Sequence, residues 1–258
     1  MSIHTLLDPN RSAQVPAKRC ALGIMTKAPV AGKVKTRLTP PLTPEEAAAL
    51  NSCFLRDVSQ AIWNATKQAP ACGVGIYTPR NAEAAYKNIL PKEFFLLPQR
   101  DGEFGQRLVS AAEDLFKVGF ETVCLINSDS PTVSPSSFAE AAIELANPGD
   151  RIVLGPSEDG GYYLIGLKKL HRRLFQDIDW STERVLEQTK AAASEIGVPV
   201  HELRPDFDVD DHFTLARLCD ELFGKNARSA TDVAMETRKF LADIMDREGR
   251  DRIWPRAR

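Results

Sequence analysis

The strongest constraint on the fold of this chain is the regular alternation of short apolar runs with segments of helical pattern. The apolar runs have the length of buried strands and lie at residues 20–25, 73–77, 94–97, 122–126, 151–154, 162–167 and 200–203. Successive strand–helix–strand units place helices over a mostly parallel sheet. The order of these segments therefore predicts an α/β fold with a mostly parallel central sheet.

Helix signals between the apolar runs support the same architecture. Thr43, Pro44 and Glu46 form the N-terminal signature of a helix that we expect to span residues 44–68. Further helices are expected at residues 82–89, between Gly105 and Gly119, at residues 135–146, at residues 182–196 and from Asp210 onward. Residues 227–258 are expected to form one amphipathic helix with a basic end.

Composition indicates one soluble domain with ordinary charge. The 258 residues are 43% hydrophobic and carry a formal net charge of −2, so neither a nucleic-acid partner nor a membrane surface is expected. We predict a flexible tail at residues 1–18, a main domain at residues 19–222 and a helical extension at residues 223–258 packed on that domain. The five scattered cysteines have no metal-type spacing, which is typical of a protein in the reducing cytoplasm.

A cluster of cations follows the first apolar run. The segment from Lys27 to Leu38 contains Lys33, Lys35 and Arg37 beside Gly32. Open α/β sheets bind ligands in loops beyond the carboxyl ends of their strands, and Lys and Arg side chains there bind phosphate oxygens. The alternative is an exposed, solvated basic loop. The position after a strand favours phosphate binding.

A carboxylate follows the run at residues 122–126 in the same way. Asp129 stands just past this run and before Pro131, so its side chain is expected to face the same crevice. Mg²⁺ and Mn²⁺ take oxygen ligands, often one or two carboxylates together with substrate phosphates. Asp129 could instead cap a turn or the next helix, but Ser134 is the better cap candidate. Asp129 is therefore a candidate metal ligand.

Two further segments have acidic and glycine-rich patterns. Asp159, Gly160 and Gly161 separate two strand-like runs, which is consistent with a hairpin turn or with a loop that passes close to a sugar or base. The later segment from Asp206 to Asp211 contains several carboxylates close together, and these repel one another unless a cation or a basic loop neutralises them. Asp210 or Asp211 could cap a helix, whereas Asp208 is a candidate second metal ligand facing Asp129.

Taken together, these motifs resemble the nucleotide-diphospho-sugar transferase superfamily, which has the GT-A fold, a Rossmann-like three-layer sandwich. They are more closely similar to radical-SAM/selenodomain-associated transferases, a family also labelled arsenosugar biosynthesis glycosyltransferases. The resemblance covers about residues 20–222 and includes the Asp-Gly-Gly-Tyr-Tyr and Asp-Trp-Ser-Thr motifs. It implies a metal-dependent transferase that takes a nucleotide or nucleotide-sugar donor and a small-molecule acceptor.

The resemblance also implies roles for individual residues. Donor phosphates would be bound by Lys27, Gly32, Lys33, Lys35, Arg37 and Ser128. Mg²⁺ or Mn²⁺ would be held by Asp129, with Asp208 or Asp210 completing its shell. The sugar or acceptor would be lined by Asp159, Gly160, Gly161, Tyr162, Trp180, Ser181 and Thr182, and the catalytic residues would be Asp129, Asp159 and Lys35.

One departure keeps two reactions open. Many glycosyltransferases of this fold have Asp-x-Asp at the metal strand, whereas this chain has Asn127, Ser128 and Asp129. A lone Asp followed by Pro is more similar to nucleotidyltransferases such as the molybdenum-cofactor and phospholactate guanylyltransferases, although their short Gly-rich loop is not intact here. Glycosyl transfer is preferred, and nucleotidyl transfer with release of pyrophosphate is the alternative.

Other functions have less support in the sequence. A non-catalytic nucleotide-binding module would be expected to have lost some of its carboxylates, yet Asp129, Asp159 and Asp208 are all present. No Gly-x-Ser-x-Gly motif accompanies a Ser, His and Asp set, and no Gly-x-Gly-x-x-Gly follows the first apolar run. The motifs thus disfavour a covalent hydrolase and a dinucleotide-dependent dehydrogenase.

Overall fold

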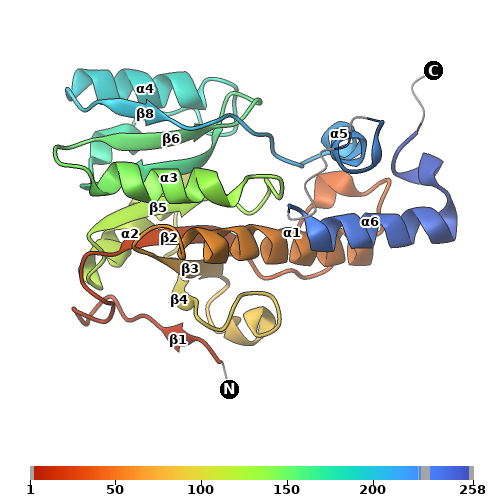
Figure 1. The fold of residues 1–258 in the computed structure, drawn as a ribbon, viewed down its shortest axis with the longest axis horizontal. Helices are drawn as coiled ribbons and strands as arrows, with labels where there is room; N and C mark the ends of the chain where they lie inside the picture. The colour runs from red at the N-terminus through yellow and green to blue at the C-terminus, as the bar shows by residue number, and fades with distance from the viewer. Residues whose placement is uncertain (1–2, 226, 228–232, 256–258) are drawn as a thin grey trace.

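The computed structural model describes residues 3–225, 227 and 233–255, and one eight-stranded sheet organises this part of the chain (Figure 1). The strands are β1 (Thr5–Leu6), β2 (Cys20–Lys27), β3 (Ala71–Thr78), β4 (Phe95–Pro98), β5 (Thr122–Ile126), β6 (Ile152–Pro156), β7 (Tyr162–Leu167) and β8 (Val200–Glu202). Their order across the sheet is β1-β4-β3-β2-β5-β7-β6-β8. β7 runs antiparallel to both of its neighbours, and the other adjacent strands pair in parallel. The predicted mostly parallel sheet is therefore confirmed.

Helices cover both faces of this sheet. They are α1 (Pro44–Ala65), α2 (Phe104–Lys117), α3 (Pro135–Ala146), α4 (Val185–Glu195), α5 (His212–Phe223) and α6 (Met235–Glu248), with short 3-10 helices η1 (Thr36–Leu38), η2 (Glu83–Tyr86), η3 (Arg172–Phe175) and η4 (Arg250–Arg252). α1 and α3 pack on one face, and α2 and α4 pack on the other (Figure 1). The result is the predicted three-layer α/β sandwich.

Strand periodicity explains how both faces become apolar. Successive side chains of a strand point to opposite faces of the sheet. Leu22 and Ile24 of β2 therefore join the core beneath α1 and α3, whereas Ala21 joins the core beneath α2. Because both faces are buried, β2 reads as a continuous apolar run instead of an alternating one.

A third core lies beside the sheet and fixes the loop that follows β2. It joins the first half of α1 to α5 and α6, and the buried side chains of Leu38, Leu50, Phe54, Leu218 and Leu241 belong to it. Figure 1 shows α5 and α6 together at one end of the molecule. Burial of Leu38 ties η1 to this core, so the cation-bearing loop has a defined path.

Several predicted boundaries differ from the structure. The first helix ends at Ala65 instead of residue 68, the helix expected at residues 82–89 is only η2, and α4 begins at Val185 because the preceding residues form turns. The start of the chain also differs from a loose tail, since β1 pairs with β4 and Leu7 is buried. A two-residue strand is too short to show a period, so the sequence gives no signal for it.

The end of the chain does not form the single helix predicted for residues 227–258, because in the described part α6 covers Met235–Glu248 and η4 covers Arg250–Arg252, with Gly249 at φ +84° between them. α6 packs against α1, and parts of the predicted helix and basic end, at residues 228–232 and 256–258, lie outside the described residues. The division into tail, domain and extension stays a prediction.

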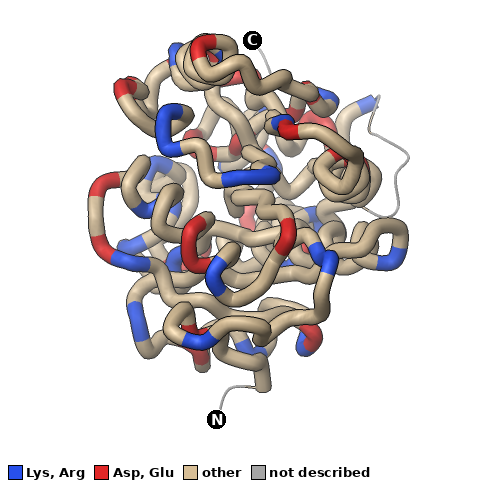
Figure 2. Tube along the Cα trace, turned by 90° about the vertical axis from the view of Figure 1, so that its left-hand side faces the viewer, with Lys and Arg blue, Asp and Glu red and all other residues tan. Residues whose placement is uncertain are grey.

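Basic and acidic residues are mixed along the chain. Figure 2, which views the molecule from the left-hand side of Figure 1, shows Lys and Arg interspersed with Asp and Glu along the chain. Within the described part of the chain, no helix has both the length and the apolar character that a bilayer span requires.

Asp57 provides the first testable prediction. This buried side chain on α1 accepts hydrogen bonds from the backbone N–H groups of Glu236 and Thr237, each at 2.9 Å, in the first turn of α6. Those N–H groups have no partner within their own helix. Asp57→Ala is expected to lower the free energy of unfolding by about 1–3 kcal/mol, measured by urea denaturation.

The matched control is Asp246→Ala, which removes an exposed carboxylate from α6 itself. It should leave the denaturation midpoint nearly unchanged. Equal midpoints for the two variants would show that Asp57 does not hold α6 on α1.

Candidate active site

The four predicted segments meet at one edge of the sheet. β2 and β5 end there, and the antiparallel pairing of β7 with β5 brings the turn between β6 and β7 to the same edge. The segment after β8 returns to it as well, because the backbone N–H of Val209 donates to the carbonyl oxygen of Asp129 at 2.9 Å. Residues that are far apart in sequence are therefore neighbours.

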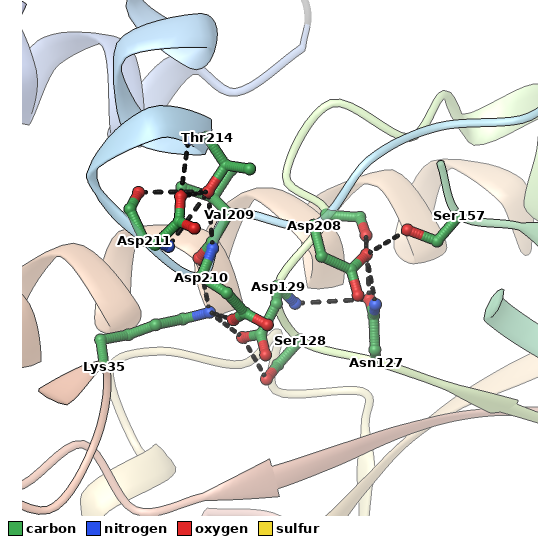
Figure 3. Close-up of polar contacts among 11 residues, drawn as sticks. Lys35, Asn127, Ser128, Asp129, Ser157, Asp208, Val209, Asp210, Asp211 and Thr214 are labelled. Atoms are coloured by element: carbon green, nitrogen blue, oxygen red, sulfur yellow. Dashed lines mark hydrogen bonds and ion pairs between the residues drawn. The ribbon is translucent and has the colours of Figure 1, made fainter. Parts of the chain in front are cut away.

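Lys35 is the central cation of this edge (Figure 3). Its Nζ lies 2.8 Å from Asp129 Oδ1, 2.9 Å from Asp210 Oδ1 and 2.8 Å from the carbonyl oxygen of Val209. The side chain is only 5% exposed and lies over the ring of Phe54. All three ammonium protons thus have acceptors, and Lys35 joins the loop after β2 to the loops after β5 and β8.

The electrostatic setting of Lys35 keeps it charged. Burial by itself lowers the pKa of the Lys35 ammonium, but the adjacent carboxylates of Asp129 and Asp210 outweigh burial and raise the pKa above its ordinary value. The backbone of Lys35 is left-handed, with φ 47° and ψ 38°. A non-glycine residue adopts this conformation at a cost, which the surrounding contacts offset. Lys35 is held in place and is not a free phosphate ligand in this conformation.

The other cations of the loop are free to bind an anion. Lys27, Lys33 and Arg37 line a cavity of about 290 Å³ together with Lys35 and Asp129. In the described part of the chain these three cations form no ion pair, in contrast to Lys35. Unpaired ammonium and guanidinium groups around a cavity suit phosphate oxygens.

Gly32 lies in the turn before the cations and does not line the cavity. Its φ is +71°, and the next residue, Lys33, donates its N–H to the carbonyl oxygen of Val30 at 2.9 Å. Nothing lies within 4 Å of the position that a Cβ at Gly32 would occupy, and Gly32 does not line the cavity. Its positive φ shapes the turn that presents the cations, and its role in phosphate binding stays a prediction.

Asn127 positions the acidic part of the site, a role that the sequence did not reveal. Its side-chain Nδ2 donates to Asp208 Oδ1 at 2.8 Å, and its Oδ1 accepts from the backbone N–H of Asp129. The hydroxyls of Ser130 and Ser157 donate to the same Asp208 oxygen at 2.6 and 3.2 Å. Asp208 is therefore fixed by three donors (Figure 3).

The charge of Asp208 is costly despite these hydrogen bonds. Burial raises the pKa of the Asp208 carboxyl to about 6, the hydrogen bond from Ser130 lowers it, and the negative charges of Asp129 and Asp159 raise it again. Three carboxylates thus repel one another around a half-buried position. Such a position favours a bound cation.

The three predicted metal ligands do not form one preassembled cluster. Asp129 and Asp210 face Lys35, whereas Asp208 faces Asn127. Among the residues that the structure describes, no group of three His, Cys, Asp or Glu side chains is placed to hold a metal ion. Asp211 caps α5 by accepting from the N–H of Thr214, so Asp210 is not the cap.

The turn between β6 and β7 is a hairpin turn that contacts Glu183 and Leu186. Asp159 Oδ1 accepts from the N–H of Gly161 at 3.0 Å. Gly160 has φ +87°, its carbonyl accepts from Leu186, and a Cβ there would lie 2.1 Å from the carbonyl oxygen of Glu183. Both the backbone angle and the close approach require glycine. The turn therefore packs tightly on the segment that precedes α4.

A second cavity, of about 530 Å³, opens beside the first. The predicted residues Ser128, Asp129, Asp159, Gly161, Tyr162, Trp180, Ser181, Thr182, Asp208 and Asp210 line it, whereas Gly160 does not. Arg37, Ser128, Asp129 and Asp210 line both cavities, so the two are adjacent. The structure thus brings together the cation-rich loop and the acidic segments that the sequence predicted to meet.

Phe104 is a further lining residue that was not predicted. Its ring meets that of Trp180 edge to face, with centroids 5.1 Å apart, and it is 44% exposed. Its helix, α2, was expected, but nothing in a single apolar residue at a helix start indicates a ligand cavity.

Comparison with known proteins agrees with this geometry. Residues 63–182 match a family described as an uncharacterized protein conserved in bacteria (DUF2064). No curated protein matches the chain. A crystal structure from Desulfovibrio desulfuricans G20, described as a proposed nucleotide-diphospho-sugar transferase, is 26% identical with a TM-score of 0.75, over 91% of this chain and 99% of the other.

A nucleotidyl transferase from Methanothermobacter thermautotroptrophicus shares the fold alone. It is 13% identical with a TM-score of 0.52, over 81% of this chain and 99% of the other. The predicted α/β fold is confirmed: its structural neighbours are described as transferases of nucleotide sugars or of nucleotidyl groups. The finer resemblance to arsenosugar biosynthesis glycosyltransferases stays a prediction.

The pKa of Asp208 gives a prediction for protein without divalent cations. The ordinary Asp pKa is 3.8 and the folded value is about 6, so between these pH values the folded state binds more protons than the unfolded state. The free energy of unfolding should therefore fall as pH rises from about 4 to about 6. Asp208→Asn keeps an oxygen for the three donors and avoids this loss, so it should be more stable at pH 7.5 by on the order of 2 kcal/mol.

Thermal or urea denaturation of both proteins across this pH range provides the measurement. Stability curves that stay parallel from pH 4 to pH 7.5 would contradict the assigned cost of the Asp208 charge.

Proposed function

We propose that this protein is a metal-dependent glycosyltransferase that moves a sugar from a nucleotide sugar to a small-molecule acceptor. One observation carries the proposal. A cavity lined by Lys27, Lys33 and Arg37, which have no ion-pair partner among the described residues, adjoins a larger cavity lined by carboxylates and aromatic rings, and Arg37 and Asp129 line both. This arrangement suits a donor whose diphosphate occupies the first cavity and whose sugar enters the second.

The donor phosphates contact Lys27, Lys33 and Arg37 in the proposed complex. Arg37 is placed at the junction of the two cavities, where its planar guanidinium suits two phosphate oxygens. The hydroxyl of Ser128, which now donates to Asp129 Oδ1 at 3.0 Å, lines both cavities and supplies a further polar contact.

Asp129 and Asp208 fit a divalent cation. Their donors are carboxylate oxygens, and Mg²⁺ or Mn²⁺ is commonly held by one or two carboxylates while substrate phosphates fill other positions. Burial raises the pKa of the Asp208 carboxyl, and the negative charges of Asp129 and Asp159 raise it further, which calls for such a cation. The ion supplies charge stabilisation for the departing nucleoside diphosphate. Asp210 adds a third oxygen ligand if its pairing with Lys35 opens.

The remaining predicted residues act on the sugar and acceptor. Asp159 is exposed at the second cavity, and its carboxylate takes the proton of the attacking hydroxyl. Tyr162, Trp180, Ser181 and Thr182 line the same cavity and bound the space for sugar and acceptor. Lys35 acts through Asp129 as a positioning residue, because its ammonium orients that carboxylate.

The second candidate is nucleotidyl transfer from a nucleoside triphosphate. Asn127 favours it, because this residue occupies the place of the first carboxylate in Asp-x-Asp and serves as a hydrogen-bond donor to Asp208. The nucleotidyl transferase neighbour has the same fold. The likeness to the Desulfovibrio protein and the resemblance to arsenosugar biosynthesis glycosyltransferases support glycosyl transfer.

The proposed setting is the cytoplasm, with no nucleic-acid or membrane partner. All five cysteines are free thiols, as in proteins of a reducing compartment. The formal net charge of −2 gives no reason to expect binding to polyanions.

A thermal-shift screen with Mn²⁺ tests donor class. Nucleotide sugars are expected to raise Tm, because a ligand that binds only the folded state stabilises it by about 2.7 kcal/mol at one hundred times its Kd. Asp129→Asn should abolish metal-dependent product formation and still give a folded protein, because Asp210 and the carbonyl of Val209 still accept from the Lys35 ammonium. Glu158→Gln, which removes a carboxylate of the same hairpin paired with Arg217, should keep full activity.

The possible results separate the candidates. A shift with nucleoside triphosphates alone, followed by pyrophosphate release, would replace glycosyl transfer by nucleotidyl transfer. Donor binding without any product would leave a non-catalytic nucleotide-binding module, and failure of Asp129→Asn to fold would make that residue structural.

A further inference from the structure

The second cavity has a charge pattern opposite to that of the first. Among its described lining residues Arg37 is the single Lys or Arg, and Arg37 belongs to the junction with the first cavity. Carboxylate-bearing residues along the same lining are Asp129, Asp159, Glu183, Asp208 and Asp210. An occupant of this cavity therefore meets mostly negative charge.

Part of this negative charge is paired with positive charge. Lys35 pairs with Asp129 and Asp210, and the proposed divalent cation takes Asp129 and Asp208. Asp159 and Glu183 remain, and within the described part of the chain neither forms an ion pair. Both residues line the second cavity and not the first, so they lie beyond the junction. The region away from the donor phosphates keeps a negative potential.

The same region has a rigid aromatic wall. Trp180 and Phe104 meet edge to face with an interplanar angle of 76°. A Cβ at Gly105 would lie 2.6 Å from Trp180 Nε1, so the indole packs directly on the first turn of α2. Met25 and Leu108 extend this wall. Aromatic rings held in this way suit an apolar face of a ligand.

The acidic rim is fixed to this wall. The carbonyl of Gly160 accepts from the N–H of Leu186 at 2.8 Å, which joins the turn bearing Asp159 to the segment bearing Trp180 and Glu183. The wall and the rim are therefore presented to a ligand as one surface, without a loop that must first order.

We propose that this surface selects an acceptor that presents an apolar face and hydroxyl groups and carries no negative charge. The inference rests on the proposed function and narrows its substrate class. Phosphorylated and carboxylated acceptors are disfavoured, because their charge would face Asp159 and Glu183. Among the described lining residues Arg37 is the single basic one, and both Arg37 and the proposed divalent cation contact the donor. The attacking hydroxyl loses its proton to Asp159, its oxygen bonds to the anomeric carbon, and the nucleoside diphosphate leaves with the bonding electrons.

Three probes of one scaffold test this selection. They are phenyl β-D-glucoside, which is uncharged, phenyl β-D-glucuronide, which carries a carboxylate, and phenyl β-D-glucoside 6-phosphate. The affinity of each probe for the full chain is measured by saturation-transfer NMR at low and at high salt. The samples contain UDP and Mg²⁺ and no Mn²⁺. The uncharged probe should bind about tenfold more tightly than either anion at low salt, and added salt should reduce the difference.

Variants locate the effect. Trp180→Ala should abolish binding of the uncharged probe, whereas Trp63→Ala, which removes an indole from another cavity on α1, should keep it. Glu183→Gln should strengthen binding of both anionic probes. Tighter binding of an anionic probe than of the uncharged one would overturn the inference, and so would the absence of binding by all three probes.

Donor binding is followed separately on the same samples. Stabilisation by UDP with Mg²⁺ reports on the first cavity. If UDP stabilises the protein and the anionic probes bind best, the acceptor inference alone fails. If UDP has no effect, the proposed function fails whatever the probes do.

Discussion

The ion pairs of Lys35 with Asp129 and Asp210 are the interaction on which the site depends. They join three loops that leave the sheet after β2, β5 and β8, and the ammonium is almost fully buried between them. Removing one partner of a buried pair leaves an uncompensated charge, which costs more than the pair contributes to stability. The left-handed backbone of Lys35 and the burial of Leu38 fix the path of the loop, and so they set the direction in which the Lys35 side chain points toward the carboxylates. The three loops thus keep one arrangement, because the ammonium group on the first loop pairs with carboxylates on the other two.

Around this cation the structure separates charges of opposite sign. Lys27, Lys33 and Arg37 line one side and form no ion pair with any residue that the structure describes, and Asp208 lies on the other side in a setting that disfavours its charge. Neither arrangement helps the folded state by itself, since like charges are brought together. Unfavourable charge clusters of this kind are expected where a ligand completes the electrostatics. An anion bound by the cations and a divalent cation bound by the carboxylates would neutralise both clusters of like charge.

Strand periodicity and helix caps are local signals, so the sequence predicted most strands of the sheet and its longer helices. The four motifs were predicted to meet because of their positions at the ends of strands and their resemblance to one superfamily. Thr43, Ser134 and Asp211 cap helices as their positions indicate. Contacts between segments could not be predicted in this way. Asn127 reads as a departure from a metal motif, yet it serves as a donor to Asp208, more than 80 residues away. Lys35 likewise reads as a phosphate ligand until its burial between two carboxylates is seen.

Crystals grown with Mn²⁺ and UDP give the most direct measurement of the central claim, because anomalous scattering locates Mn²⁺ independently of the protein. The account predicts an anomalous peak in contact with carboxylate oxygens of Asp129 and Asp208, and diphosphate oxygens in contact with Lys27, Lys33 or Arg37. Mn²⁺ and UDP bound elsewhere on the protein, with these carboxylates and cations contacting neither, would contradict it.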